Sequence, residues 1–177
     1  MVEGFDADSV ILDTHIKAVV VGYDHHISYG KILKAASYLK DLNVPFIATN
    51  TDQSFPSTSR AITVPGTGCI VAPVQLASGR NPIVIGKPET LMIDYLRKEY
   101  GLVSSRSVFT GDRMNTDMLL AHRCGMKGIL VTTTGVNSVS DIEAASKSNN
   151  PADRGLVPEF YLDSMHVFSQ LLTTVTR

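Results

Sequence analysis

The 177-residue chain contains no tryptophan, only two cysteines, and no apolar run near the roughly 18 residues that a membrane-spanning helix needs. Cys69 and Cys124 are far apart and form no Cys-x-x-Cys pair, so we expect two buried free thiols in a reducing compartment. Basic residues are not in excess, since 16 Lys and Arg face 17 Asp and Glu. This balance argues against nucleic acid or an anionic membrane as the main partner. The first residues lack the basic and apolar regions of a signal peptide, and we expect a cytoplasmic protein.

Glycine-rich phosphate-binding motifs are missing as well. The chain has no Gly-x-Gly-x-x-Gly, and Gly86-Lys87-Pro88 is not a P-loop because no serine or threonine follows the lysine. No expected strand ends in the Asp-x-Asp that a phosphate-and-metal site would use as its nucleophile. If the chain binds a phosphate or a metal, it must therefore do so through single polar residues at the ends of its strands and helices.

Short apolar runs alternate with helical patterns along the whole chain, which predicts an α/β fold with a parallel sheet and helices on both faces. Ser28 is a candidate helix N-cap, Gly79 and Gly101 are candidate helix ends, and Pro88 and Thr116 mark candidate helix starts. The segment 53–68 is rich in Ser, Pro, Thr and Gly and predicts a loop. The pattern restarts near 79–82, which indicates two blocks. The strands are expected at 18–22, 44–48, 82–86, 108–111, 127–132 and 160–162, and the other helices at 69–77, 139–147 and 165–172.

Charged residues follow two of the expected strands. Lys87 follows the strand 82–86, and Asp112 and Asp117 follow the strand 108–111. Open α/β sheets place their chemistry at such strand tips, so these residues on neighbouring tips predict a phosphate-plus-metal site. Lys87 would hold a phosphate as a point charge, Asp112 would be one Mg²⁺ ligand, and Asp117 would orient Lys87 or a metal-bound water. Taken singly, Asp112 is also compatible with a turn and Lys87 with a solvated surface position, while Arg113 fits a structural ion pair.

Two further groups of polar residues follow strands of the first block. Asn50 and Asp52 follow the strand 44–48, and they could face a substrate or simply shape the loop. His25 and His26 are adjacent, so their side chains point to opposite faces in extended backbone and suit a single metal site poorly.

Several motifs together resemble the haloacid dehalogenase-like (HAD) superfamily, and more narrowly its 4-nitrophenylphosphatase branch, which includes phosphoglycolate phosphatase and pyridoxal phosphate phosphatase (chronophin). They are Gly86-Lys87-Pro88, Gly111 to Asp117, His122 to Met126 and Thr134-Gly135-Val136. Val19 to His26 and Pro65 to Gly68 are similar to the cap domain of that branch. The resemblance implies an α/β fold made of a C2-type cap, incomplete at its N-terminus, over residues 1–80, and the C-terminal half of a Rossmann-like HAD core over 81–177.

The resemblance also implies an activity, namely Mg²⁺-dependent hydrolysis of a small phosphate monoester, of the 2-phosphoglycolate or pyridoxal phosphate type, through an aspartyl-phosphate. By position, Lys87 corresponds to the family's motif lysine, Asp112 to its third Mg²⁺ ligand and Asp117 to the second acidic residue of the same motif. Asn50 and Asp52 are similar to cap residues that approach the substrate. The expected partners are a small phosphorylated metabolite and a second copy of the chain, joined through the cap.

The main departure from the family is the nucleophile, which lies in an N-terminal Asp-x-Asp-Gly motif that this chain lacks. Asp6-Ala7-Asp8 has similar spacing, but no apolar strand precedes it. Three hypotheses follow. The chain is a phosphatase represented by part of its sequence, or a short non-catalytic homologue that acts as a dimerisation or binding module, or a module that binds a small molecule through Lys87 and Asp112 alone. In each case we expect no turnover from this chain alone, and we expect an uncovered sheet edge to favour low solubility or oligomers.

Overall fold

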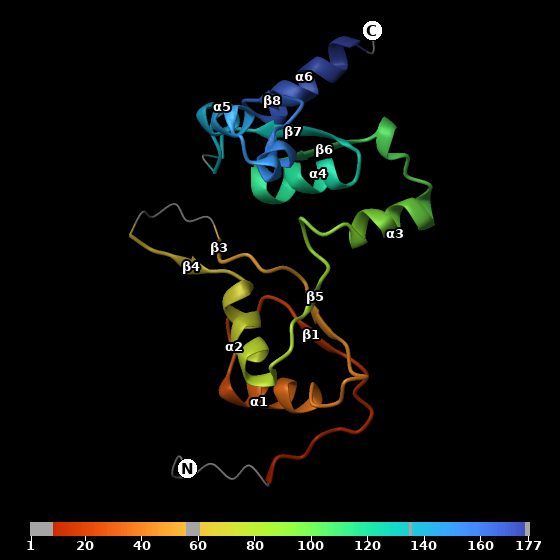
Figure 1. Cartoon of the computed structure of the whole chain (residues 1–177), viewed down its shortest axis with the longest axis vertical. Helices are drawn as coiled ribbons and strands as arrows, with labels where there is room; N and C mark the ends of the chain where they lie inside the picture. The colour runs from red at the N-terminus through yellow and green to blue at the C-terminus, as the bar shows by residue number, and fades with distance from the viewer. Residues whose placement is uncertain (1–8, 56–60, 135, 176–177) are drawn as a thin grey trace. The chain divides into compact units, whose positions relative to one another are not determined.

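The computed structural model describes residues 9–55, 61–134 and 136–175, and these form two compact units that divide between Gly86 and Lys87. In Figure 1 the first unit runs from red to yellow-green and the second from green to blue. Both units are α/β with parallel sheets, which confirms the predicted fold class. The division into a cap over 1–80 and half a catalytic core over 81–177 stays a prediction. In the described part of the chain, no helix combines the length and the apolar character required to span a membrane.

The first unit contains a three-stranded parallel sheet in the order β1-β2-β5, made of β1 (Val19–Val21), β2 (Phe46–Ala48) and β5 (Ile83–Val84). Its two helices, α1 (Tyr29–Tyr38) and α2 (Gly68–Ser78), pack on one face of the sheet. The core on that face is formed by buried apolar residues, chiefly Val19, Val21, Leu39, Phe46, Ile70, Val71 and Val74. On the other face Val20 and Ile83 are exposed, so the prediction of helices on both faces is wrong for the described part of this unit.

Helix ends in both units follow the local signals of the sequence. Ser28 caps α1, its hydroxyl oxygen accepting the Lys31 N–H at 3.4 Å. Gly79 ends α2 with φ 67°, and Gly101 ends α3 (Leu91–Tyr100) with φ 65°, in the left-handed region where a side chain is unfavourable. These three predictions are confirmed.

Three predictions about the local structure are wrong. Within 53–68 the structure has a short antiparallel pair, β3 (Ser54–Phe55) and β4 (Val64–Pro65), and two-residue strands carry no periodic signal. Pro88 lies before α3 instead of in its first turn, because the helix begins at Leu91. Cys69 is exposed, whereas Cys124 is a buried free thiol as expected.

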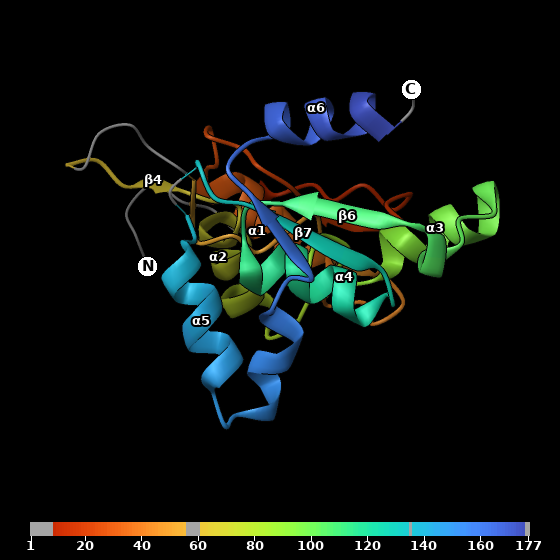
Figure 2. The same ribbon diagram turned by 90° about the horizontal axis from the view of Figure 1, so that it is seen from above.

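The second unit contains a three-stranded parallel sheet in the order β6-β7-β8, made of β6 (Val108–Gly111), β7 (Lys127–Val131) and β8 (Phe160–Leu162). Figures 1 and 2 show two of its helices, α4 (Leu119–Arg123) and α6 (Met165–Val175), on opposite sides of this sheet. The helix α5 (Val139–Lys147) has the bounds expected from the sequence. Shorter helical turns lie at Ser104–Arg106, Met114–Met118 and Pro151–Leu156.

The turn that joins β6 to α4 differs from the expected helix start. Thr116 does not cap a helix, because it lies inside the π-helical turn Met114–Met118. The carboxylate of Asp117 instead folds back and accepts the backbone N–H groups of Asp112 and Arg113. A buried acidic side chain thus binds two backbone N–H groups that precede the helical turn, in place of the expected Thr116 cap.

Candidate functional site

Asp117 is the centre of the candidate site in the second unit. Its Oδ1 accepts a hydrogen bond from Lys87 Nζ at 2.6 Å, and its Oδ2 accepts the N–H groups of Asp112 and Arg113, both at 3.0 Å. The side chain of Asp117 is 2% exposed, whereas that of Lys87 is 43% exposed. Both carboxylate oxygens are therefore engaged, and Asp117 fixes the position of the Lys87 ammonium and the shape of the turn at 112–113.

Gly111 makes this arrangement possible. A Cβ atom added to Gly111 would overlap the carboxyl group of Asp117, so only glycine lets the buried carboxylate lie against the end of β6. The sequence signal for this arrangement is the pair Gly111-Asp112 with a second aspartate, Asp117, five residues after Asp112.

Lys87 and Asp112 reach this site from different sheets. The strand before Lys87, β5, pairs with β2 of the first unit, while Asp112 follows β6 of the second sheet. The prediction that they stand on neighbouring strand tips of one sheet is wrong, because strand pairing over this distance cannot be recognised from the run of apolar residues. The ion pair with Asp117, which the sequence reasoning allowed as one of two roles, is what holds Lys87 beside the turn.

Asp112 is half-buried at the end of β6, and its N–H is bonded to Asp117. Within the described part of its unit, the Asp112 carboxylate has no hydrogen-bond or ion-pair partner. It is thus free to act as an oxygen ligand, the type that Mg²⁺ prefers. The described residues bring no group of three His, Cys, Asp or Glu side chains together, and Asp117 is already engaged. The residues present fit one ligand position of a magnesium site and do not form a complete one.

Asn137 is a structural residue of the site that sequence reasoning missed. Its Oδ1 accepts the N–H of Met114 at 2.9 Å and so ties the turn after Asp112 to the loop before α5. That loop is itself fixed by a capping box, in which Ser138 and Asp141 bond reciprocally. Hydrogen bonds from the backbone and hydroxyl of Ser138 hold the pKa of the Asp141 carboxyl below its usual value. The signal in the sequence is a polar residue within the loop between β7 and α5, directly before the N-cap Ser138.

Asn50 and Asp52 lie in the first unit, in the loop after β2. Asn50 Oδ1 accepts the N–H of Asp52 at 3.4 Å, and both residues are half-buried. Gly68 at the start of α2 donates its N–H to the carbonyl of Asp52 at 2.8 Å, and a Cβ on Gly86 would come within 3.1 Å of Asn50 Cβ. These contacts give the loop a defined shape. A role in substrate binding stays a prediction.

The histidine pair and the remaining acidic candidates lie elsewhere. The rings of His25 and His26 pack on each other with centroids 3.9 Å apart. Asp24 forms an ion pair with Lys31 at 2.5 Å, and this contact is the main reason that the pKa of Asp24 is below its usual value. Asp6 and Asp8 lie outside the described residues.

Comparison with known proteins identifies the family. Residues 84–157 match the HAD-hydrolase-like family model. The chain is 40% identical to glycerol-3-phosphate phosphatase of Rattus norvegicus over 157 residues, which are 89% of this chain and 48% of that protein. The chain belongs to the HAD-like hydrolases. Chronophin of Rattus norvegicus is 38% identical over 153 residues, which are 86% of this chain and 48% of that protein.

Solved structures of HAD-like proteins share the fold. The 4-nitrophenylphosphatase of Thermotoga maritima matches with a TM-score of 0.71 at 30% identity, over 91% of this chain and 57% of that one. NagD of E. coli K-12 matches with a TM-score of 0.68 at 28% identity, over 88% of this chain and 56% of that one. The chain thus spans about half the length of the curated relatives it matches.

Proposed function

We propose that this chain carries the lysine and metal side of a phosphate monoester hydrolase site. The observation that carries the proposal is the buried Asp117, which binds Lys87 through one oxygen and the turn after Asp112 through the other. It ties a cation, Lys87, to the turn whose Asp112 carboxylate is free to bind a metal. The proposed substrate is a small phosphate monoester, of the 2-phosphoglycolate, pyridoxal phosphate or glycerol phosphate type, which agrees with the phosphatases among the relatives.

In this proposal Lys87 acts on the phosphate and Asp112 on the metal. The lysine ammonium is a compact charge with three donors, and Asp117 leaves two of them for phosphate oxygens. Because the ion pair anchors it, Lys87 loses little side-chain freedom when a phosphate binds. Mg²⁺, when bound, would neutralise the negative charge of the phosphoryl group, with Asp112 as one of its ligands.

Hydrolysis through an aspartyl-phosphate also needs a nucleophilic carboxylate. None of the strands in the described residues ends in Asp-x-Asp, so we expect the 177 residues alone to bind phosphate without turning over an ester. The activity therefore belongs to a site with a further acidic residue, and this chain supplies its binding and positioning groups.

Calorimetry with inorganic phosphate and Mg²⁺ tests the binding part. Lys87→Met should weaken phosphate binding at least about tenfold, which is about 1.4 kcal/mol. Asp112→Asn should remove the dependence on Mg²⁺. The matched control is Lys98→Met, because Lys98 is an exposed lysine of the same unit whose ammonium lies 3.6 Å from the carboxylate of Glu99. Equal phosphate affinity of the Lys87→Met and wild-type chains would contradict the proposal.

Phosphate release from 4-nitrophenyl phosphate and 2-phosphoglycolate tests the catalytic part. We expect release with Mg²⁺ to stay at the level of the Asp112→Asn variant. Release that is clearly faster than that of Asp112→Asn would show that a nucleophile is present in the chain, and the assignment of its acidic residues would be wrong.

A second candidate function is a non-catalytic dimerisation module, and the open face of the β1-β2-β5 sheet favours it. Val20 is 60% exposed and Ile83 is 55% exposed there, on either side of the half-buried Ile47, and aliphatic side chains exposed on one face often mark interaction surfaces. Light scattering should then give a dimer mass that Val20→Thr shifts to the monomer. A monomer at all concentrations, or a dimer that Val20→Thr leaves intact, would contradict this function.

A further inference from the structure

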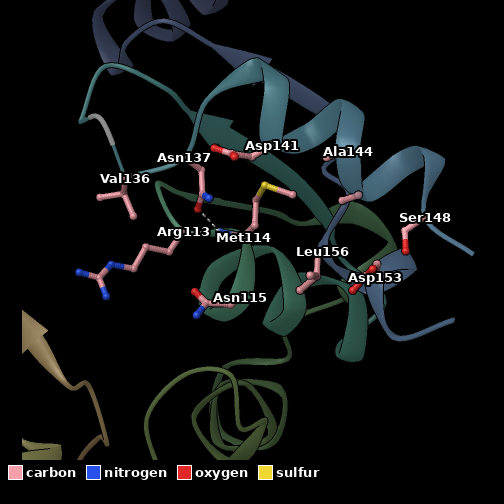
Figure 3. A pocket seen from close by; sticks show the side chains of 11 residues that line it. Arg113, Met114, Asn115, Val136, Asn137, Asp141, Ala144, Ser148, Asp153 and Leu156 are labelled. Carbon is pink, nitrogen blue, oxygen red and sulfur yellow. Dashed lines mark hydrogen bonds between the residues drawn. The ribbon is translucent and has the colours of Figure 1, made fainter. Parts of the chain in front are cut away.

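A cavity of about 580 Å³ lies in the second unit, beside the turn that follows Asp112. It is open to solvent on one side and is bordered by the π-helical turn Met114–Met118, by α5 and by the turn Pro151–Leu156 (Figure 3). Its volume lies in the range of about 300–1,000 Å³ that is typical of small-molecule sites. The apolar part of its lining comes mainly from Met114, Ala144, Ala145 and Leu156.

Two opposite charges flank this apolar lining. Figure 3 shows Arg113 and Asp153 at opposite ends of the group of lining side chains, with the Arg113 side chain extending outward from the group. Both residues are half-buried. Within the part of the chain that the structure describes, neither the Arg113 guanidinium nor the Asp153 carboxylate has a hydrogen-bond or ion-pair partner. A charged group that is partly removed from water without a partner loses favourable hydration free energy. A ligand that pairs with both groups would offset that loss.

The balance of charge restricts the kind of ligand. Asp141 adds a second carboxylate to the lining, and the capping box keeps it ionised at neutral pH. One guanidinium and two carboxylates disfavour a dianionic phosphate ester, while a simple cation would leave the guanidinium unpaired. A small molecule with an anionic and a cationic end suits the cavity best, since a guanidinium binds a carboxylate in a bidentate manner.

We propose that this cavity is a second binding site, for a small zwitterion of the amino-acid class, whose carboxylate binds Arg113 and whose ammonium group binds Asp153. The carbon chain between the two ends would lie against Met114 and Leu156. Because the proposal uses neither Lys87 nor Asp112, it does not depend on the phosphatase function.

The site is physically connected to the candidate phosphate site. Arg113 and Met114 directly follow Asp112, and the N–H groups of Arg113 and Met114 are held by Asp117 and Asn137. A ligand on Arg113 therefore restrains the same turn that carries Asp112. A ligand bound in the cavity would therefore stabilise the turn that carries Asp112 without contacting the candidate phosphate site.

An NMR titration of the full chain with 3-aminopropanoate, 4-aminobutanoate and 6-aminohexanoate tests the proposal. One chain length should give saturable shifts in the millimolar range at backbone amides around the cavity, including Met114 and Ala144. Butanoate and butylamine, which each carry one of the two charges, should bind at least about tenfold more weakly. Absence of saturable binding by all three zwitterions would overturn the proposal.

Charge-removing variants assign the two ends. Arg113→Gln and Asp153→Asn should each weaken zwitterion binding about tenfold, and Arg106→Gln should leave it unchanged, since Arg106 is an exposed arginine outside the cavity. Inorganic phosphate should not compete. Binding that survives both cavity variants, or that phosphate displaces, would show that the zwitterion binds elsewhere. Far-UV circular dichroism of each variant confirms that it is folded.

Discussion

The two partners of the ion pair between Lys87 and Asp117 differ in burial, and this difference predicts how the second unit responds when either side chain is changed. Asp117 is almost fully buried, whereas Lys87 is 43% exposed and can turn toward water once its partner is gone. A charge-assisted hydrogen bond contributes about 1.5–3 kcal/mol, and exposure of Lys87 reduces its value. We expect Asp117→Asn to lower the free energy of unfolding by about 1–2 kcal/mol.

Asp117→Ala should cost more, because it also removes the acceptor for two backbone N–H groups. Each such bond contributes about 1 kcal/mol net, so the loss should reach about 3–4 kcal/mol. Lys87→Met leaves the Asp117 side chain buried and bonded to the backbone, and the double variant with Asp117→Asn removes both charged side chains. The coupling free energy of this pair in a double-mutant cycle should be about 1–2 kcal/mol.

Urea unfolding of the full chain, followed by far-UV circular dichroism, measures these values. The control cycle uses the pair Lys98–Glu99, in which the lysine is 83% exposed and the atoms are 3.6 Å apart, so its coupling should be near zero. A Lys87–Asp117 coupling no larger than that of this control pair would refute the reasoning. So would equal losses for Asp117→Ala and Asp117→Asn, because the backbone N–H groups would then have other acceptors.

Three further predictions concern the cap of α5, the two cysteines and two glycines. Asp141→Asn should lower the free energy of unfolding at pH 7. The difference from the wild type should be smaller in urea titrations near pH 3. The reason is that the lowered pKa of the Asp141 carboxyl stabilises the fold above the usual value near 4, and this contribution is lost as the pH falls through the folded-state pKa. Iodoacetamide at pH 8 should label Cys69 in the native chain and Cys124 only after denaturation, because burial protects the latter and raises its pKa; equal rates by mass spectrometry would contradict this. Gly79→Ala should cost about 1–2 kcal/mol because of its left-handed φ, and Gly111→Ala should cost more, because its methyl group meets the Asp117 carboxyl; the urea midpoints of the two variants check the order.

Features that depend on local chemistry could be predicted from the sequence. The helix 139–147 has the expected bounds, because Ser138 and Asp141 form a capping box within one turn. The ends at Gly79 and Gly101 follow from the left-handed backbone that glycine favours. The Gly-Asp pair at the end of 108–111 likewise marked the candidate site, because an acidic residue after an apolar strand is a local pattern.

Features that depend on long-range pairing could not be predicted. The strand at Ile83–Val84 was expected in the second block, but it pairs with β2 and completes the first sheet. The pairing of Ser54–Phe55 with Val64–Pro65 is equally invisible in a segment without periodicity. Asn137 and the cavity beside it arise only when the loops after β6 and β7 come together, so no single window of the sequence contains them.

The two compact units are continuous in sequence, with one chain crossing between Gly86 and Lys87. This continuity has a consequence for synthesis on the ribosome, where domains generally fold in the order in which they emerge, at about 5–20 residues per second. The first sheet is complete once β5 has emerged, since none of its three strands comes from beyond Val84. Nascent chains in which Gly86 has left the ribosome should therefore already hold a protease-resistant first unit, before the ion pair between Lys87 and Asp117 has formed.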